Sequence, residues 1–477
     1  MPPPWPSTAP TAAHRAAYAD ARPRSFWLDD LPPRDPHPRL GGDTRADLCV
    51  IGGGYTGLWA ALHALTDAPG RDVVVLEATR CGDGASGRNG GFLNASITHG
   101  LANGLARFAA EMPVLERLGL ENFHGLVDDL ARHGIDAELQ TTGDLVVALE
   151  PHHVPELAEE AELLRRFGHE VELLDGPAVR ALVDSPTYLG ALWDRTGAAL
   201  VHPGKLADGL RDAAVRAGAR IHEGTQACGI DGDPDGRGVA VRTPGGVVRA
   251  RRVLLATSAY PPLVRAVRHY VAPVYDYVLV TEPLNQARRD AIGWRGGQGI
   301  ADPANRFHYY RMTADGRVVF GGYDAVYRYG GPVADRLDDH DATFAALSQH
   351  FFTTFPQLEG LRFTHRWGGA IDTCSRFSVF FGTAMGGRIA YAAGYTGLGV
   401  GAARFGARVA LDLLDGRDTE ATRLRYVRRR PVPFPPEPLR AAVIALTRNR
   451  LAAADERQGR RGLWLRTLDR LGLGFDS

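Results

Sequence analysis

The sequence is poor in cysteine, and Lys205 is its only lysine. Its formal net charge at pH 7 is zero. Its four cysteines, Cys49, Cys81, Cys228 and Cys374, show no C-x-x-C spacing. Cys49 and Cys228 fall in apolar, strand-like runs, which favours a reduced, cytoplasmic protein over a disulfide framework. Acidic and basic residues number 55 each, which argues against a nucleic-acid or anionic-membrane partner.

Targeting signals are also missing. The first residues lack a charged segment followed by an apolar core, so we expect no signal peptide and no lipid anchor. Residues 48–66 carry no formal charge and could pass a hydropathy scan, but their glycines recur at fixed spacing and an acidic strand follows soon after. We therefore expect no membrane span, and we assign no residue to a metal.

The glycines of that stretch form the main motif of the chain. Residues 48–51 are an apolar run typical of a buried parallel strand. Gly52, Gly54 and Gly57 then follow a G-x-G-x-x-G pattern, which allows a tight turn, close approach to a pyrophosphate, and packing of helix on strand. Residues 59–65 are predicted to form the helix whose first N–H groups face the phosphate.

A second strand gives this motif its context. Residues 72–77 are apolar and end at Glu77, which lies 20 residues after Gly57. A carboxylate at this position can accept both hydroxyls of an adenosine ribose. A chance glycine turn is the alternative, but strand, turn, helix, strand and acid in this order favour a dinucleotide site.

A glycine-rich loop follows Glu77. Residues 81–91 include five glycines, which indicates backbone held close to a ligand or a merely flexible loop. Its position after the acid-ended strand favours the first interpretation. Ser86, Arg88 and Asn89 are therefore candidate donors to a pyrophosphate or a flavin ring.

A second glycine-rich helix start lies near the end of the chain. Residues 388–393 are predicted to form a strand, residues 394–400 a turn, and the helix continues to about Leu414. The dipole of this helix favours a negative charge at its N-terminus. In a flavoprotein that charge develops at the N1–C2=O edge of the reduced ring.

The length of 477 residues predicts two or three domains. We expect an N-terminal arm with little regular structure, of which Ser25–Leu28 docks on the body, and a Pro-rich, then helical tail that packs through Leu463, Trp464, Leu465 and Leu468. Residues 103–133 are expected to be helical. The predicted parts are an arm (1–42), an FAD-binding domain (43–100, 196–262 and 366–428), a substrate domain (101–195 and 263–365) and a tail (429–477).

The substrate domain alternates apolar and polar residues, which predicts antiparallel sheet. On the strand 307–311, His308 and Tyr310 share one face, and Tyr309 and Arg311 share the other. Either face can line a pocket, or the aromatic residues can simply fill the core. We assign catalytic or substrate-orienting roles to His308, Tyr310, Arg311 and Arg306, with Arg311 or Arg306 binding an acidic group if the substrate has one.

Motifs along the chain resemble those of FAD-dependent amino-acid oxidoreductases of the D-amino-acid-oxidase superfamily, with the greater likeness to its gamma-glutamylputrescine and aminophosphonate oxidoreductase branches. The likeness runs from about Ser25 to Leu414. The motifs that carry it are Cys81–Gly82, Gly84–Gly91, His202–Leu206, Thr281–Leu284, Tyr309–Arg311 and Gly394–Gly397.

This resemblance implies an α/β protein with a glutathione-reductase-like FAD-binding Rossmann domain and an α+β substrate domain on a mixed or antiparallel sheet. It implies oxidation of a C–N bond of an amine or amino acid, with electrons passed to oxygen or another acceptor. The residues assigned to FAD lie in the glycine turns or in strands beneath them. They are Gly52, Gly53, Gly54, Tyr55, Thr56, Gly57, Glu77, Ala78, Ser86, Arg88, Asn89, Gly90, Gly91, Ala227, Thr257, Trp367, Gly394, Thr396, Gly397, Leu398 and Gly399.

The chain departs from the family pattern at three places. Leu398 stands where the family often has a histidine in the last glycine motif. The sarcosine-oxidase branch attaches flavin through a cysteine that would fall near Gly369 or Ala370, so we expect non-covalent FAD, with Cys374 a few residues away. That branch also uses a lysine near the flavin for oxygen activation, and the matching strand here has none. We expect oxygen reactivity to rest on another cation, His308 being one candidate, or another acceptor to serve.

Two other functions stay open. A nicotinamide-dependent dehydrogenase could use the same first motif, but a simple NAD domain has no need of the second glycine-rich helix start. A flavin-binding subunit that relays electrons or is catalytically silent in a complex would share both motifs.

Overall fold

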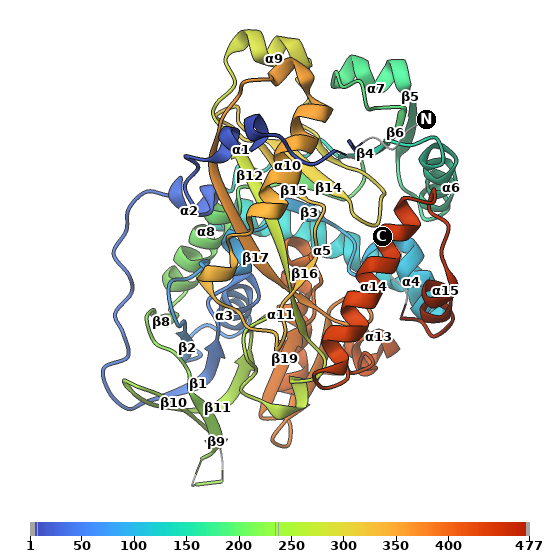
Figure 1. Ribbon diagram of the computed structural model, residues 1–477. Coiled ribbons are helices and arrows are strands. Elements are labelled where there is room, and N and C mark those ends of the chain that lie inside the picture. Colours follow the sequence, from blue (N-terminus) through green and yellow to red (C-terminus); the bar gives the residue numbers. More distant parts are fainter. Residues whose placement is uncertain (1–4, 7, 234, 237, 474–477) are drawn as a thin grey trace.

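The computed structural model describes residues 5–6, 8–233, 235–236 and 238–473. Two large sheets lie beside each other, with helices packed against their faces and the two chain ends on the side of the second sheet (Figure 1). Within the described residues, no helix is both long enough and apolar enough to cross a membrane.

The first sheet is built around the predicted dinucleotide motif. Strands pair in the order β18-β19-β11-β1-β2-β8, and a hairpin of β9 and β10 extends from β11. β1 pairs in parallel with β11 and β2. β2 and the apolar end of β1, residues 48–51, are buried. The strands are β1 (Thr44–Ile51), β2 (Val73–Leu76), β8 (Arg220–His222), β9 (Gly229–Gly232), β10 (Val239–Thr243), β11 (Gly246–Leu255), β18 (Phe380–Ala384) and β19 (Ile389–Ala393).

Three helices from distant parts of the chain cover this sheet. α3 (Tyr55–Asp67) contacts both α8 (Pro203–Arg216) and α11 (Gly399–Asp415). α3 is nearly all apolar and is buried along eleven of its thirteen residues, as expected for a helix enclosed on every side. The predicted strands and helices of this domain are therefore present, and β18 is an addition that the sequence analysis did not anticipate.

The second sheet is mostly antiparallel, as its alternating sequence predicts. Its strands pair in the order β16-β12-β15-β14-β13-β4-β6-β5, and β17 pairs with the other edge of β12. The strands are β4 (Asp144–Ala148), β5 (Val171–Asp175), β6 (Gly190–Asp194), β12 (Ala272–Thr281), β13 (Gly299–Ala301), β14 (His308–Met312), β15 (Val318–Gly322), β16 (Val326–Tyr327) and β17 (Phe363–Thr373). β3 (Phe92–Asn94) and β7 (Ala198–Leu200) form a small separate pair.

The helices of this half are α6 (His153–Arg166), α7 (Gly176–Leu182), α9 (Gln286–Ile292) and α10 (Asp341–Thr354). α10 packs on β12 and β15, α6 and α7 pack on strands near the end of the sheet, and α9 is short. Short 3-10 helices span Ala85–Gly87, Ala109–Glu111, Arg265–Val267, Asp335–Leu337 and Pro356–Leu358.

The predicted domain boundary at 366 falls inside a strand. β17 pairs with β12 from Phe363 to Thr373, so the chain leaves the second sheet only after Thr373. Pairing with β12 keeps residues 368 and 369 extended.

The predicted helix over 103–133 is two helices, α4 (Gly100–Phe108) and α5 (Met112–His133), and both contribute to the core of the first domain. The break precedes Pro113, which stands in the first turn of α5, where a missing N–H costs nothing. Leu115, Leu126 and Leu130 pack into the cluster that holds α3 and α11. The insert 101–195 thus contributes to both halves of the protein.

The N-terminal arm has more regular structure than expected. It contains α1 (Ala12–Tyr18), which packs on α10, and α2 (Phe26–Asp29). Phe26 and Trp27 are buried, so the predicted docking of Ser25–Leu28 is confirmed. Residues 1–4 and 7 of the predicted arm lie outside the described residues.

The C-terminal segment is helical, as predicted. Its helices are α12 (Glu420–Arg423), α13 (Arg425–Arg428), α14 (Leu439–Asp455) and α15 (Leu463–Arg470). α14 crosses the front of the molecule in Figure 1 and α15 follows it near α4 and α6. Leu465 is buried as expected, but Leu463 is 74% exposed, because it lies on the other face of α15.

Candidate active site

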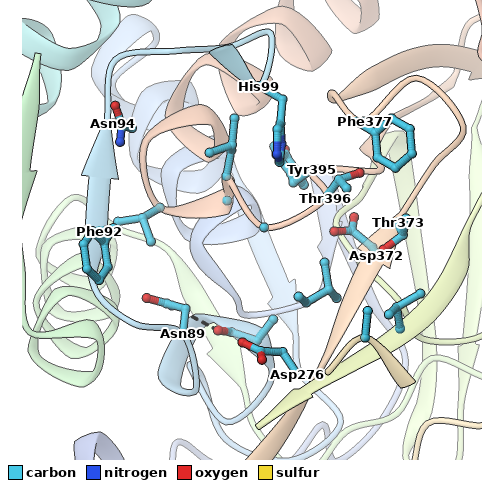
Figure 2. Close-up of a pocket in the computed structure, with 18 of the residues that line it drawn as sticks. Asn89, Phe92, Asn94, His99, Asp276, Asp372, Thr373, Phe377, Tyr395 and Thr396 are labelled. Atoms are coloured by element: carbon cyan, nitrogen blue, oxygen red, sulfur yellow. Dashed lines mark hydrogen bonds between the residues drawn. The ribbon is translucent and has the colours of Figure 1, made fainter. Parts of the chain in front are cut away.

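A single cavity of about 1790 Å³ extends between the two sheets. It starts at the carboxyl ends of β1 and β2, passes the glycine-rich loop and the start of α11, and reaches the face of the second sheet. Figure 2 shows its middle part, with Asn89, Phe92 and Asn94 on one wall, His99, Tyr395 and Thr396 above, and Asp276 below.

The glycines of the first motif are held in place by tight packing. A Cβ at Gly57 would lie 1.9 Å from the carbonyl oxygen of Gly52, so the third glycine lets α3 pack against the turn. Gly52 has a φ of 109°, a conformation that favours glycine. Gly54 caps α3 without a side chain, which leaves the start of this helix facing the cavity.

Glu77 lies directly beyond β2 and lines the same end of the cavity. Its carboxylate accepts N–H groups of Gly53 at 2.7 Å and Thr79 at 2.8 Å. Burial raises the pKa of Glu77, and these two hydrogen bonds oppose that shift. Ala78, Ala227 and Thr257 line the cavity together with Glu77. Its role in ribose binding remains a prediction.

Hydrogen bonds from residues outside the glycine-rich loop hold it in place. Trp27 Nε1 donates to the carbonyl of Asn89 at 2.8 Å, and Trp367 Nε1 donates to the carbonyl of Arg88 at 2.9 Å. Ser86 Oγ accepts the N–H of Tyr55 at 2.9 Å, which ties the loop to the start of α3. Trp367 was assigned to FAD, but it lies behind the loop and outside the cavity lining, so it acts through the loop.

Two predicted donors of this loop already have partners. Asn89 Nδ2 donates to the carbonyl of Ser86 at 2.9 Å, and its Oδ1 accepts the N–H of Gly91. Arg88 forms an ion pair with Asp338 and donates to the carbonyl of Asp83. The backbone of Ser86, Arg88, Asn89 and Gly90 lines the cavity, whereas Gly91 packs beneath it against Val201, where a Cβ would lie 2.3 Å from the carbonyl oxygen.

The second glycine motif brings another helix start to the cavity. Gly397 and Thr396 have φ values of 93° and 50°, and with Leu398 and Gly399 they line the space before α11. Asp372 supports the turn by accepting the N–H of Gly394 at 2.7 Å, and burial raises the pKa of Asp372 to about 7. The α11 dipole therefore makes this wall favourable for negative charge.

These observations test whether FAD fits the residues present. The N-termini of α3 and α11 and the carboxylate of Glu77 lie along one cavity. The close contacts of the glycines leave no room for side chains in the turns. The arrangement fits a dinucleotide whose pyrophosphate faces α3 and whose ring faces α11.

On β14 the structure selects the face opposite to the one that carries His308 and Tyr310. Phe307 and Tyr309 line the cavity. His308 and Tyr310, which alternate with them along the strand, point into the core around α10. His308 donates to or accepts from Asp302 and His350 at 2.9 and 3.0 Å and is fully buried. The structure therefore places His308 and Tyr310 outside the cavity lining, and it gives no support to the catalytic roles predicted for them.

Tyr310 and Arg311 have partners in the core. The hydroxyl of Tyr310 pairs with that of Tyr188 at 2.8 Å. Arg311 shares the face of Tyr309, but it lies beneath the glycine-rich loop and donates to the carbonyl of Val201 at 2.6 Å. Burial lowers the pKa of Arg311 to about 10. It supports the loop and does not reach the cavity lining.

Arg306 does line the cavity. Its guanidinium carbon lies 3.7 Å from the ring centroid of Tyr323, which also lines the space. This stacking fixes the side chain while leaving its charge available to a ligand. Of the four residues predicted for catalysis or substrate orientation, Arg306 alone has access to the cavity.

The sequence analysis missed Asp276, the acid of β12 that faces the cavity. Asp276 Oδ2 accepts the hydroxyl of Tyr309 at 2.6 Å, and its Oδ1 accepts the N–H of Tyr277. Burial raises the pKa of Asp276 to about 6. Tyr309 in turn packs on Gly90, which places this pair next to the glycine-rich loop. The available signal was a single acid between two tyrosines in an otherwise apolar strand.

One group of described residues has the spacing of a metal site. Potential ligand atoms of Glu150, His152 and His153 lie within 4.8 Å of one another. Nδ1 of His153 already accepts two backbone N–H groups at 3.3 Å. The group lies at the turn between β4 and α6, and the expectation of no metal remains a prediction.

The chain was compared with known proteins. The family model described as FAD dependent oxidoreductase matches residues 47–413. Gamma-glutamylputrescine oxidoreductase of Escherichia coli (strain K12) is 34% identical over 392 residues, which cover 80% of this chain and 86% of that protein. Glycine oxidase from Geobacillus kaustophilus has a TM-score of 0.64 at 21% identity, covering 79% of this chain and 96% of that chain.

A second solved structure is similar to this chain as well. Iminodiacetate oxidase from Chelativorans sp. BNC1 has a TM-score of 0.64 at 19% identity, covering 80% of this chain and 98% of that chain. The predicted fold, a Rossmann-type domain joined to an α+β substrate domain, is thereby confirmed.

Proposed function

The chain belongs to the family of FAD dependent oxidoreductases and FAD is its cofactor; from this premise we propose that it oxidises a C–N bond of a small amine or amino acid. The observation that supports the reaction is the continuity of one cavity from the two glycine motifs to the Asp276–Tyr309 pair. The name of the Escherichia coli relative, an oxidoreductase of gamma-glutamylputrescine, agrees with an amine substrate.

FAD would supply the oxidant for removal of a hydride equivalent from the carbon beside the nitrogen, and water would hydrolyse the resulting imine. In this chain the N-terminus of α3 would hold the pyrophosphate, Glu77 the ribose, and the N-terminus of α11 the electron-rich edge of the ring. The backbone of the loop at Ser86–Gly90 would lie along the ring.

The substrate amine must lose its proton before oxidation, because an ammonium group has no free electron pair. Asp276 is the acid placed for this task, since it faces the cavity beside the loop and has a pKa of about 6. Near neutral pH it is mostly ionised and can take the proton. The hydroxyl of Tyr309, 2.6 Å away, fixes its orientation.

The cavity also has a cation that can orient an acidic substrate. Arg306 lines the space and stacks on Tyr323, so a carboxylate or phosphonate of the substrate could pair with its guanidinium. Arg311, the other predicted candidate, is engaged beneath the loop.

Non-covalent attachment of FAD is part of the proposal. The thiol of Cys374 is buried, donates to the carbonyls of Ser378 and Gly394 at 3.2 and 3.3 Å, and lies outside the cavity lining. This position supports a cofactor that acid treatment releases.

Oxygen or another acceptor would take the electrons. Lys205 pairs with Glu138 at the start of α8 and lies outside the cavity lining, and His308 is buried behind β14. A lysine-independent oxygen reaction is therefore proposed, with Arg306 as one of the arginines that line the cavity. The four cysteines are free thiols, which supports a reducing, cytoplasmic compartment.

Anaerobic mixing of the purified holoenzyme with amines, N-methyl amino acids, amino acids and aminophosphonates tests the function. We expect bleaching of the flavin absorption by at least one amine class. Bleaching by none of them would favour the silent or electron-relay subunit, and a colourless protein that binds NAD would favour the dehydrogenase. Reoxidation in stopped flow, with oxygen and with an artificial acceptor, then separates oxidase from dehydrogenase.

A further inference from the structure

Part of the cavity wall comes from a segment outside the family match. Residues 429–473, here called the C-terminal cap, follow the last residue matched by the family model, 413. The cap residues that line the cavity are mostly apolar. They are Val432, Pro433, Phe434, Pro435, Val443, Ile444, Thr447, Arg448, Leu451, Leu465, Leu468 and Leu473.

The helix α14 turns one face toward this space. Val443, Thr447 and Leu451 line the cavity at four-residue spacing, with Ile444 beside them. Only Ala454 of α14 is fully buried, so the apolar face of this helix is covered by no protein core. Leu446, on another face, is 36% exposed and lies outside the lining.

The wall that faces the cap is also aliphatic. Leu157, Leu163 and Leu164 of α6 and Leu101 of α4 line the cavity there. The loop before α15 lies on α6, because a Cβ at Gly459 would be 3.3 Å from the Glu156 carboxylate. Figure 1 shows α4, α6 and α15 on the same side of the molecule. This part of the cavity, between α4, α6, α14 and α15, is called the aliphatic branch below.

Hydrogen bonds hold the cap against the second sheet. Asp455 accepts the N–H groups of Asn305 at 3.0 Å and Arg306 at 3.1 Å, just before β14. Glu437 accepts the hydroxyl of Tyr327 at 2.5 Å near the other end of α14. Both ends of α14 are therefore fixed, and the aliphatic branch joins the cavity beside Arg306.

The charged residues of the branch and the volume of the cavity indicate which kind of ligand fits. Glu156, Glu159 and Glu160 line the branch along α6, with Arg166 at the end of the same helix and Arg448 on α14, so its rim is charged while its walls are aliphatic. The cavity volume of about 1790 Å³ exceeds the roughly 300–1,000 Å³ of a pocket for one ligand. There is room for FAD and for a substrate that extends well beyond the reacting carbon.

We propose that the substrate is an amine with an extended aliphatic chain, and that the C-terminal cap selects it by enclosing that chain in the aliphatic branch. This inference rests on the proposed amine oxidation and names the substrate class. The nitrogen end reaches Asp276, and the chain lies between Ile444 of the cap and Leu163 of α6. The cap thus acts on specificity, while the cofactor half of the cavity is left unchanged.

A series of linear primary amines from propylamine to octylamine tests this in the holoenzyme. The KM measured from flavin reduction should fall about threefold to fourfold for each added methylene until the branch is full. Binding is measured separately by calorimetry with 1,1-dimethylalkylamines of the same lengths. These amines carry no hydrogen on the carbon beside the nitrogen, so they bind but cannot be oxidised.

The variant Ile444→Asn should flatten the chain-length dependence in both measurements, and Leu446→Asn on the same helix should leave it unchanged. Leu468→Asn on α15 is a second variant, in case the first loosens α14. The flavin spectrum and melting temperature of each variant show whether the fold and the cofactor are retained.

The outcomes separate the two proposals. If neither amines nor amino acids bleach the flavin, the proposed function fails, and if amino acids alone bleach it, the substrate class is wrong. If amines bleach it but KM and calorimetric affinity of the wild type do not change with chain length, the substrate class is wrong. If the dependence exists but persists in Ile444→Asn and Leu468→Asn, the cap does not enclose the chain.

Discussion

The cofactor end of the cavity is lined by glycine turns and the starts of α3 and α11, with Glu77 as the acid assigned to the ribose. The substrate end is lined by side chains from β12, the residues around β14 and the C-terminal cap. Backbone sites tolerate few changes because their shape is set by packing, whereas side-chain sites can be altered singly while the fold persists. The two ends should therefore respond differently to mutation.

The largest effect is expected at the cofactor end from Gly57→Ala. The added methyl group would meet the backbone of Gly52 at 1.9 Å, so α3 must move away from the turn. Overpacking of this kind costs about 1–3 kcal/mol or more, and we expect a lower melting temperature and protein without flavin. Gly41→Ala is the matched control, since nothing lies within 4 Å of its added Cβ. Full flavin content in Gly57→Ala would overturn this view of the turn.

At the substrate end, Asp276→Asn should leave flavin content unchanged and lower kcat by roughly 10²–10⁴-fold. In the wild type, kcat/KM should fall as pH drops through about 6, where Asp276 takes up a proton. In Asp276→Asn, kcat/KM should not show this fall at low pH. An unchanged pH profile would show that Asp276 is not the proton acceptor.

The same substitution has a predictable effect on stability. The folded pKa of about 6 lies above the ordinary value of 3.8, so the folded state binds the proton more tightly than the unfolded state. The burial of the charged carboxylate therefore costs stability increasingly as pH rises from 3.8 to about 6. Relative to the wild type, Asp276→Asn should be more stable at pH 8 than at pH 4, as measured by urea unfolding at both pH values.

Glu77→Ala should weaken FAD binding without affecting the substrate end. Loss of hydrogen bonds to a charged acceptor costs about 1.5–3 kcal/mol each, and the purified variant should be depleted of flavin but regain activity at high FAD concentration. Retention of full flavin occupancy after dialysis would contradict the ribose assignment.

Arg306→Met tests the cation of the substrate end. It should raise KM for amines that carry a carboxylate or phosphonate, and leave KM for uncharged-tail amines unchanged. The loss of a charged hydrogen bond corresponds to about 1.5–3 kcal/mol. Equal KM values for both classes would remove Arg306 from substrate binding.

The smallest effect on activity is expected from His308→Gln. This side chain lies behind β14 between Asp302 and His350, so the change should lower the melting temperature while kcat and the oxygen reaction stay essentially unchanged. A large loss of kcat with an unaltered melting temperature would restore His308 to the catalytic site.

The predictions from sequence succeeded where a motif describes contiguous backbone. Gly52, Gly57 and Glu77 face one another as expected, because a strand, a glycine turn and a helix close over a few residues. They failed on β14, where alternation identifies two faces but not which of them is turned to the cavity. That choice depends on the pairing of β14 with β13 and β15 and on α10, which buries the face of His308.

The sequence by itself determined the family, the cofactor and the residues that form the dinucleotide motif, because these depend on local geometry that few residue types permit. Tertiary structure alone decided that Asp276 meets Tyr309, that Arg311 supports a loop, and that residues after 429 close the cavity. Such contacts join segments from 33 to hundreds of residues apart. They follow from how sheets and helices pack, which no short pattern in the chain records.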